Sequence, residues 1–363
     1  MPSVKDMLTM PSIKQTILLC LIVTINGYAV ANGWSTQTLS HQGITPSFRA
    51  SEVTDGVIWV GGTHSSIFRS DNGGESYQNV SLNLIDKTIE GDLDIRDIHA
   101  FDKLTAIAMT AGEGDLTRLY KTVDGGHKWT LLLKNYPQGT FYDSIDFWDD
   151  QNGILMGDPV DGYFVILLTK DGGQSWQRVA KAQIPVMTNQ EIAFAASGNT
   201  VITGSNGQAW FVTGGFSAHV LQSDDFGNTW VRKTAPLYSK TKYAGAYGLS
   251  INKKNEVFVV GGDFEERGKQ YSNMAKKVNL TLINGNKTHA WQQVSNGQHG
   301  LRTAMACTDK VCIASGKLSS DISFDQGATW QLMEGPGFYT LASENDVIVA
   351  AGHDGRVGLL VDK

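Results

Sequence analysis

The chain has few cysteines, no excess of basic residues and no apolar run long enough to cross a membrane comfortably. Its 30 Lys and Arg residues are outnumbered by 36 Asp and Glu residues, which gives a formal net charge of −6. Nucleic-acid-binding proteins usually carry a basic surface, so nucleic acid is not expected as a partner. The sequence also lacks a G-x-G-x-x-G motif between a strand and a helix, and every other cofactor motif, so no cofactor is expected.

The main apolar run, TILLCLIVTI at 16–25, is typical of an export signal. Lys14 supplies the preceding positive charge, and Ala29-Val30-Ala31 forms a cleavage site of small residues. We therefore expect residues 1–31 to be a signal peptide and residues 32–363 to form one periplasmic or secreted domain, with no membrane span after cleavage. A membrane anchor is the weaker alternative, because the run is short.

Two cysteines remain after this cleavage, Cys307 and Cys312, and four residues separate them. If they oppose each other on the two strands of a tight hairpin, an oxidising compartment favours a cross-strand disulfide. The alternative is two free thiols. The register of the hairpin decides between the two, and the sequence leaves that register open.

A recurring eight-residue pattern, rich in glycine and ending in an aromatic residue, is abundant in the chain. TKDGGQSW at 169–176 combines hydroxyl groups, an aspartate, paired glycines and a tryptophan. Four related copies are SDNGGESY at 70–77, TVDGGHKW at 122–129, SDDFGNTW at 223–230 and SFDQGATW at 323–330. We call all these copies, including TKDGGQSW, the boxes. A further segment, NGNKTHAW at 284–291, has the pattern of a decayed copy. A catalytic centre is normally needed once per domain, so we interpret this repeated motif as architecture.

The spacing of the boxes predicts a β-propeller. Their final aromatic residues lie 39 to 61 residues apart, which suits one four-stranded blade per repeat. A strand ending in small residues precedes each box, VITGS at 201–205 among them, and a seventh such segment at 347–360 has no box after it. We predict an all-β, seven-bladed propeller of four-stranded antiparallel blades, closed by the N-terminal strand at 33–39. Six blades is the alternative.

Within such a blade the boxes are expected to join the third and fourth strands. Their paired glycines permit positive φ, and their Asp, Ser and Thr side chains can bond the free backbone amides of the turn. No metal site is expected from the aspartates, because these carboxylates belong to separate blades. The boxes should then lie on one rim, and the starts of the inner strands should surround the mouth of the central channel on the opposite rim.

The boxes resemble the Asp-box, or BNR repeat, of sialidases and other secreted propellers. Most of residues 44–361 is similar to the family of the photosystem II stability and assembly factor, on stretches such as SFRASEV, DIRDIHAF, AGEGDL, FWDDQNGILMGDPVDG and EIAFAASG. This resemblance implies a non-catalytic propeller outside the membrane that holds a protein client on one face of a rigid ring. The likeness to sialidases is more distant.

The candidate binding residues stand at the expected starts of the seven inner strands, in PSFRAS, DIRDIH, FYDSID, NQEIAF, AGAYGLS, HGLRTAM and GFYTLA. They are Arg49, Arg96, Tyr142, Asp143, Glu191, Tyr247, Arg302 and Tyr339. The planar guanidinium of arginine suits bidentate binding of a carboxylate or phosphate. The alternative is that these arginines and acids form structural ion pairs. Loops on the same rim add Asp158, and the polar insertion at 265–277 is expected to be a solvated loop, with a partner contact as the alternative.

Two functions fit this set of residues. We expect an exported, monomeric, non-catalytic propeller that binds a protein client or an anionic ligand at the channel mouth, in the manner of an assembly or stability factor. The alternative is a sialidase-like glycoside hydrolase or lyase acting on acidic sugars. The residues that match the sialidase inventory by type are Arg49, Arg96 and Arg302 for the substrate carboxylate, Tyr339 with Glu191 for the nucleophile, and Asp143 for the acid–base role.

Overall fold

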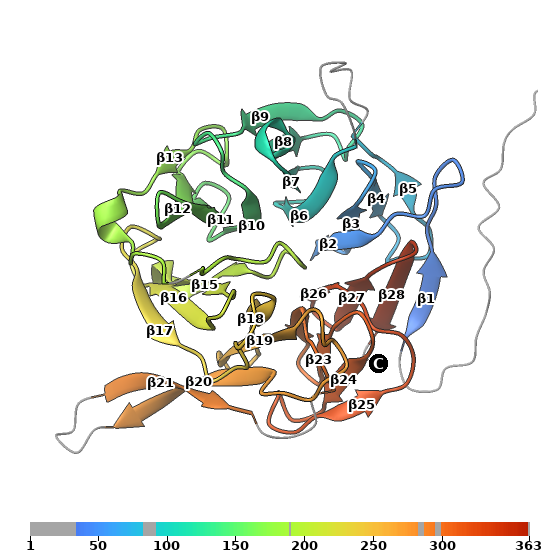
Figure 1. Cartoon of the computed structure of the whole chain (residues 1–363). Coiled ribbons are helices and arrows are strands. Elements are labelled where there is room, and N and C mark those ends of the chain that lie inside the picture. The colour runs from blue at the N-terminus through green and yellow to red at the C-terminus, as the bar shows by residue number, and fades with distance from the viewer. Residues whose placement is uncertain (1–33, 83–91, 189, 282–286, 295–298, 362–363) are drawn as a thin grey trace, which may run out of the picture.

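The computed structural model of the chain describes residues 34–82, 92–188, 190–281, 287–294 and 299–361. These residues form seven four-stranded antiparallel sheets arranged as a ring around a central axis (Figure 1). The predicted seven-bladed propeller is therefore confirmed, and the six-bladed alternative is wrong. The predicted signal peptide, residues 1–31, lies outside the described residues.

The first four blades follow one another along the chain, each numbered from its inner strand outward. Blade one holds β2 (Phe48–Thr54), β3 (Val57–Gly62), β4 (Ile67–Ser70) and β5 (Gln78–Asn79). Blade two holds β6 (Asp94–Ala100), β7 (Ala106–Ala111), β8 (Arg118–Thr122) and β9 (Thr130–Lys134). Blade three holds β10 (Tyr142–Phe147), β11 (Gly153–Val160), β12 (Tyr163–Thr169) and β13 (Gln177–Arg178). Blade four holds β14 (Val201–Thr203), β15 (Ala209–Thr213), β16 (His219–Ser223) and β17 (Val231–Thr234).

The remaining three blades complete the ring. Blade five holds β18 (Ala244–Ile251), β19 (Val257–Asp263), β20 (Met274–Thr281) and β21 (Lys287–Gln293). Blade six holds β22 (Ala304–Cys307), β23 (Cys312–Ser315), β24 (Ser320–Ser323) and β25 (Gln331–Met333). Blade seven holds β26 (Thr340–Glu344), β27 (Val347–Ala351), β28 (Arg356–Val361) and β1 (Ser35–Thr38). Three short 3-10 turns lie in loops, at Gly114–Leu116, Lys181–Gln183 and Ser205–Gly207.

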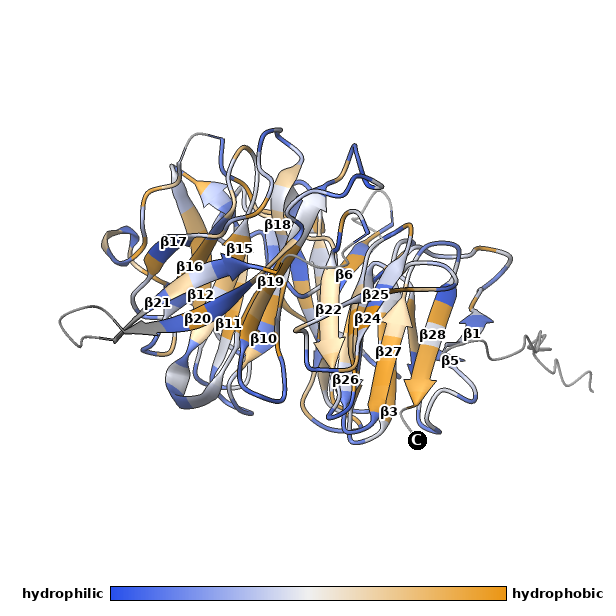
Figure 2. Cartoon of the chain, turned by 90° about the horizontal axis from the view of Figure 1, so that it is seen from below, coloured by the Kyte–Doolittle hydropathy of each residue, from blue (hydrophilic) through white to orange (hydrophobic). Residues whose placement is uncertain are grey.

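Apolar strands packed between neighbouring blades form the core. β3 reads VIWVGG and all six of its residues are buried. Trp59 on this strand belongs to one core cluster with Ile95 and Ile98 of β6, so blade one packs on blade two through apolar side chains. Figure 2 shows hydrophobic residues along many of the strands and hydrophilic residues along many of the loops. Removal of this apolar surface from water is the main stabilising contribution.

The N-terminal strand closes the ring, as predicted. β1 pairs antiparallel with β28, with Ser35 opposite Leu359 and Thr38 opposite Arg356. Just before β1, Trp34 packs on Phe338, with ring centroids 5.1 Å apart. The last blade is thus built from both ends of the described chain, which leaves β28 without an exposed edge.

Five boxes form the turns between third and fourth strands. In the box of blade three, Thr169 Oγ1 donates to Asp171 Oδ1 (2.8 Å), and the amides of Gly173 and Ser175 donate to Thr169 Oγ1 and Asp171 Oδ1 at 2.9 Å each. The predicted decayed copy at 284–291 is not such a turn. Its first three residues lie outside the described residues, and Trp291 lies within β21 opposite Lys277.

Blade four departs from the prediction at its inner strand. NQEIAF was expected to start that strand, but the inner strand is the short β14, so VIT at 201–203 occupies the inner position instead of the second one. Residues 195–199, here called the plug, run across the ring instead. Figure 1 shows the yellow-green chain before β15 reaching into the middle of the ring.

Hydrogen bonds to several blades hold the plug in the channel. Ser197 Oγ donates to the carbonyl oxygen of Thr303 in blade six (2.7 Å), and Thr340 Oγ1 of blade seven donates to the carbonyl oxygen of Ser197 (2.7 Å). On the other side, Ser144 Oγ of blade three donates to the carbonyl oxygen of Gly198 (2.7 Å). The plug therefore crosses the ring between blade three on one side and blades six and seven on the other.

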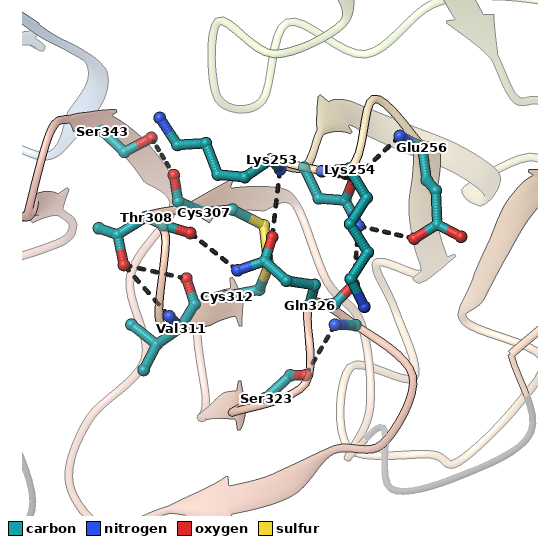
Figure 3. Close-up of a disulfide and its surroundings, with 12 residues drawn as sticks. Lys253, Lys254, Glu256, Cys307, Thr308, Val311, Cys312, Ser323, Gln326 and Ser343 are labelled. Atoms are coloured by element: carbon teal, nitrogen blue, oxygen red, sulfur yellow. Dashed lines mark hydrogen bonds between the residues drawn. A yellow bond between two sulfur atoms is a disulfide. The ribbon is translucent and has the colours of Figure 1, made fainter.

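Cys307 and Cys312 form a disulfide at the turn between β22 and β23 (Figure 3). The two residues are direct register partners, with Cα atoms 4.0 Å apart, so the register favours the disulfide over two free thiols. Gln326, from the box of blade six, donates through Nε2 to the carbonyl oxygens of Thr308 (2.9 Å) and Asp309 (3.0 Å) in that turn. The box and the disulfide turn therefore brace each other on the same rim.

Candidate functional site

The rim opposite the boxes carries three arginines near the channel axis. We call Arg49, Arg96 and Arg267, together with Tyr339 and Asp94, the arginine mouth. Burial lowers the pKa of Arg49, the charges of Arg96 and Arg267 lower it further, and Tyr339 and Asp94 raise it. The other four side chains are thus each within electrostatic reach of Arg49, although the five residues come from blades one, two, five and seven.

Arg49, the second residue of β2, lies over the ring of Tyr339. Its Cζ atom is 4.2 Å from the ring centroid. The buried Nε of Arg49 has no hydrogen-bond partner, and within the described part of the chain Arg49 forms no salt bridge. A guanidinium held on an aromatic face beside other cations is stabilised by a bound anion.

Arg96 is oriented by its own blade and by the plug. Its Nη2 pairs with Asp94 Oδ2 at 2.7 Å, and its Nη1 donates to the carbonyl oxygen of Ala195 at 2.7 Å. The buried Nε of Arg96 and Oδ1 of Asp94 have no hydrogen-bond partner. The plug therefore forms the floor of the arginine mouth and fixes the direction of one of its guanidiniums.

Arg267 was not among the predicted site residues. It lies in the insertion at 265–277, where its Cζ is 3.8 Å from the ring centroid of Phe264 and its carbonyl oxygen accepts from the Leu301 amide (2.8 Å). The insertion therefore folds onto the functional rim and supplies a cation to it. The only signal in the sequence was an arginine in a polar insertion on that rim.

Asp143 lies in the bulge of β10 and is fully buried. Neither of its carboxyl oxygens has a hydrogen-bond partner. Burial raises the pKa of Asp143 well above its usual value, Asp158 raises it further, and Arg96 opposes the change. Burial also raises the pKa of Asp158 to about 6, although this side chain accepts a hydrogen bond from the Ala193 amide (2.9 Å). Burial thus disfavours the ionised form of both acids, and neither forms a salt bridge with Arg96 among the described residues.

The two tyrosines Tyr142 and Tyr247 are buried in packing rather than presented to a ligand. The hydroxyl of Tyr142 donates to the carbonyl oxygen of Tyr136 (2.7 Å), and its ring belongs to an apolar core cluster. Tyr247 stacks on Phe194 with centroids 4.1 Å apart, and its hydroxyl donates to the carbonyl oxygen of Tyr243 (2.6 Å). The structure does not bring these two hydroxyls into the arginine mouth.

Arg302 forms a structural ion pair inside blade six. It is fully buried, and its Nε and Nη2 lie 2.8 Å and 2.7 Å from Asp321 Oδ2. Its Nη2 also donates to Ser319 Oγ (3.2 Å), and His299 Nδ1 lies 2.7 Å from Asp321 Oδ1. The structural interpretation therefore holds for Arg302, and Arg267 is the third arginine of the mouth instead.

Glu191 is likewise engaged within blade four. Its carboxylate accepts hydrogen bonds from Thr213 Oγ1 (2.6 Å) and the Thr188 amide (2.7 Å), and it pairs with His219 (2.9 Å) and Arg232 (3.1 Å). Burial alone raises the pKa of Glu191, but these hydrogen bonds and Arg232 lower it to about 2. Glu191 is thus held by contacts within blade four that favour its ionised form, and none of its described contacts is Tyr339.

A second hollow lies on the other side of the plug, toward the boxes. It is a cavity of about 260 Å³ whose lining includes Glu52, Asp97 and Asp146. The carboxyl of Asp97 accepts hydrogen bonds from Ser144 Oγ and the Ile145 amide, both at 2.8 Å. This carboxyl therefore links blade two to blade three. Burial raises the pKa of Glu52 and of Asp97. The sequence did not point to this cavity.

Two further findings limit the chemistry of the described residues. No group of three or more His, Cys, Asp or Glu side chains among them is arranged to hold a metal ion. Within the same residues, no helix has the length and apolar character needed to cross a membrane.

No protein-family model and no curated protein sequence matches the chain. Solved structures do. One is YCF48 bound to a D1 peptide, at 15% identity and a TM-score of 0.61, with 92% of this chain and 96% of that chain covered. The chain has the fold of YCF48. YCF48 from Cyanidioschyzon merolae is similar at 13% identity and a TM-score of 0.64, with 91% of this chain and 99% of that chain covered.

A lyase shares the same architecture as YCF48. Virginiamycin B lyase from Staphylococcus aureus is similar at 11% identity and a TM-score of 0.59, with 90% of this chain and 99% of that chain covered. At these identities the likeness shows the fold alone, so the function has to be argued from the residues of the site.

Proposed function

We propose that this protein is an exported, monomeric, non-catalytic propeller that binds a protein client at the arginine mouth through a carboxylate or another anionic group of the client. The observation that carries this proposal is Arg49, which lies on Tyr339 with no salt bridge among the described residues. Arg96 and Arg267 act on the same guanidinium and lower its pKa. An incoming anion offsets this mutual repulsion and forms charge-assisted hydrogen bonds.

The fold likeness supports a protein as the ligand. The YCF48 structure holds a D1 peptide, and that protein shares the seven-bladed ring of this chain. A propeller offers a rigid face on which little conformational entropy is lost when a client binds. We therefore propose an assembly or stability factor, whose action is to hold one segment of a client protein.

The second candidate is an enzyme acting on acidic sugars, and the lyase fold neighbour is the observation in its favour. The residues that would fill the catalytic roles of a sialidase do not lie together in this structure. Glu191 is bonded within blade four and Arg302 within blade six, so Tyr339 lacks the expected base and the mouth lacks the expected third arginine. The binding function is therefore the better supported of the two.

Capture of the client tests the binding function. Native protein, Arg49→Ala and Arg178→Ala are immobilised at equal folded amounts and exposed to the soluble and membrane extracts of the source cells. Arg178, on the outer strand of blade three, is the matched control because it is an arginine outside the arginine mouth. We expect one client to bind native protein and Arg178→Ala, and Arg49→Ala to lose about 1–3 kcal/mol of binding free energy.

A panel of sialosides and uronides tests the enzymatic candidate in parallel. We expect no turnover by the native protein. Turnover that Tyr339→Phe abolishes would contradict the proposed binding function, because a tyrosine hydroxyl would then act as the nucleophile.

Export is a separate part of the proposal and has its own test. We expect the protein purified from the source cells to begin at Asn32 and to be found outside the cytoplasm, because residues 14–31 have the order of a signal peptide. N-terminal sequencing after fractionation measures both. An intact Met1 or Met10 terminus in the cytoplasmic fraction would contradict export.

A further inference from the structure

Among blades one to six, blade five is the one whose third and fourth strands are not joined by a box turn within the described residues. Its packing against blade four therefore differs from the packing seen at the boxes. In blades three and six, the glycine at the fifth position of the box packs on the second strand of the preceding blade. Gly173 of blade three lies so close to Ile107 of β7 that no Cβ fits, and Gly327 of blade six lies in the same way on Phe258 of β19. Both partners are the second residue of their strand.

Trp210 is the corresponding residue of blade four, the second of β15. The box that would have covered it is replaced by the hairpin of β20 and β21. Figure 1 shows this orange hairpin extending away from the ring. A pocket of about 450 Å³ lies at this position and is lined by residues of blades four and five, among them Trp210, Lys254, Glu256, Lys277 and His289.

Two side chains that line the pocket, Trp210 and Lys277, carry hydrogen-bond donors for which the described residues supply no acceptor. Trp210 is only 2% exposed, and its indole Nε1 has no hydrogen-bond partner. The Nζ of Lys277 lies 5.2 Å from the centroid of the Trp210 ring. Within the described part of the chain Lys277 forms no salt bridge, whereas its neighbour Lys276 pairs with Glu256 (3.1 Å).

The charges around the pocket leave a positive balance. Glu256 is the only acid among the described residues of the lining, and Lys276 and the Asn252 side-chain amide (2.8 Å) already bond its carboxylate. Lys254 and Lys277 line the pocket as cations. Burial lowers the pKa of Lys277, and Asp224 raises it without coming within ion-pair distance. Asp224 itself accepts hydrogen bonds from the Gln222 side chain (2.9 Å).

We propose that this pocket is a second ligand site, which binds an oxyanion, a carboxylate or a phosphate, through the ammonium of Lys277 and the indole N–H of Trp210. An oxyanion supplies the acceptor that both donors lack, and Lys254 adds charge at the pocket edge. The pocket lies on the rim of the boxes, opposite the arginine mouth. It is therefore independent of the proposed client site, and either proposal can fail alone.

The test follows the indole N–H resonance of Trp210 in ¹⁵N-labelled protein, assigned by its loss in Trp210→Phe. Acetate, inorganic phosphate and a short poly-glutamate peptide are titrated separately at constant ionic strength, balanced with chloride. We expect a saturable shift for at least one of these anions. Saturation by phosphate or acetate identifies a small-anion site, and tighter saturation by the peptide identifies a site for an acidic chain segment.

Two variants make the result specific. Lys277→Gln removes the cation and is expected to weaken the affinity at least ten-fold, the loss of about 1.4 kcal/mol of binding free energy. Lys253→Gln removes a nearby exposed lysine that does not line the pocket, and is expected to leave the affinity unchanged. An absent shift, a linear shift equal to that of chloride, or an unchanged affinity in Lys277→Gln would overturn the proposal. Arg49→Ala is expected to leave this titration unchanged.

Discussion

At the scale of single residues, two arginines predicted for the same role have different environments. Arg302 is fully buried and bonded to the equally buried Asp321, whereas Arg49 has an aromatic ring beside it and no acid within salt-bridge distance among the described residues. A buried pair contributes little net stability, but removing one partner leaves an uncompensated buried charge. The effect of truncation should therefore differ greatly between the two arginines.

Arg302→Ala is expected to lower the free energy of unfolding by roughly 3–5 kcal/mol, because Asp321 then stays buried without its cation. Arg49→Ala is expected to change it by less than about 1 kcal/mol, because no ion pair is broken. Urea unfolding of both variants, followed by tryptophan fluorescence, measures the difference. Equal destabilisation by the two substitutions would contradict the distinction between a structural and a ligand-binding arginine.

The sequence could predict part of the site at this scale. Arg49, Arg96 and Tyr339 were found because they stand at or just before the starts of inner strands, which a propeller gathers at one mouth. Arg302 stands at a similar position, but its side chain reaches Asp321 on a strand of its own blade, and strand periodicity does not reveal such a pairing. Arg267 comes from an irregular insertion, for which no periodicity exists.

At the scale of elements, the plug is the feature that the sequence could not reveal. NQEIAF has the alternation of an inner strand, so strand periodicity predicted one there. The plug at 195–199, which follows this segment, crosses the channel because Ser197 and Gly198 form hydrogen bonds with Thr303, Ser144 and Thr340, residues distant in sequence. Such long-range partners override local β-propensity. The same shift moved Glu191 from the expected channel mouth into the ion network of blade four.

Gly198→Ala tests the role of the plug. Gly198 has a φ of +72°, and an added Cβ would collide with the carboxyl of Asp97. We expect backbone strain to lower the free energy of unfolding of this variant by roughly 1–3 kcal/mol, and the collision with Asp97 to lower it further. We also expect weaker client binding, because Ala195 in the plug positions Arg96.

Gly56→Ala is the matched control for the plug. Gly56 has a similar φ of +75° but no atom within 4 Å of an added Cβ, so only the backbone strain is introduced. Thermal unfolding and client affinity are measured for both variants. A plug variant no less stable than the control, with full client affinity, would show that residues 195–199 do not support the mouth.

At the scale of the whole molecule, the ring was predictable because its repeat is local. Each box carries its own turn chemistry, so the number and order of blades follow from counting boxes and strands. The closure was predictable for a related reason: the last blade lacked a fourth strand, and residues 33–39 had the pattern of one. Blade five was harder to predict, because its altered box resembles the others in sequence while its residues from Lys287 belong to a strand.

Deleting residues 32–40 tests the closure of the ring. The deletion removes β1, which pairs with β28, and the buried Leu39, whose loss alone costs about 2–5 kcal/mol. We expect a large, cooperative loss of stability and aggregation through the exposed edge of β28. Differential scanning calorimetry and light scattering measure these effects. A deletion variant that unfolds at the native temperature and stays monomeric would show that β1 does not close the ring.

The central claim is that the arginine mouth binds an anionic group of a client, and the affinity of one client segment tests it most directly. Isothermal titration calorimetry of that segment is run against native protein, Arg49→Ala and Arg178→Ala, at low and at high salt. We predict that Arg49→Ala weakens the affinity about ten-fold or more, that Arg178→Ala leaves it unchanged, and that high salt weakens native binding. Equal affinities for native protein and folded Arg49→Ala would contradict the account.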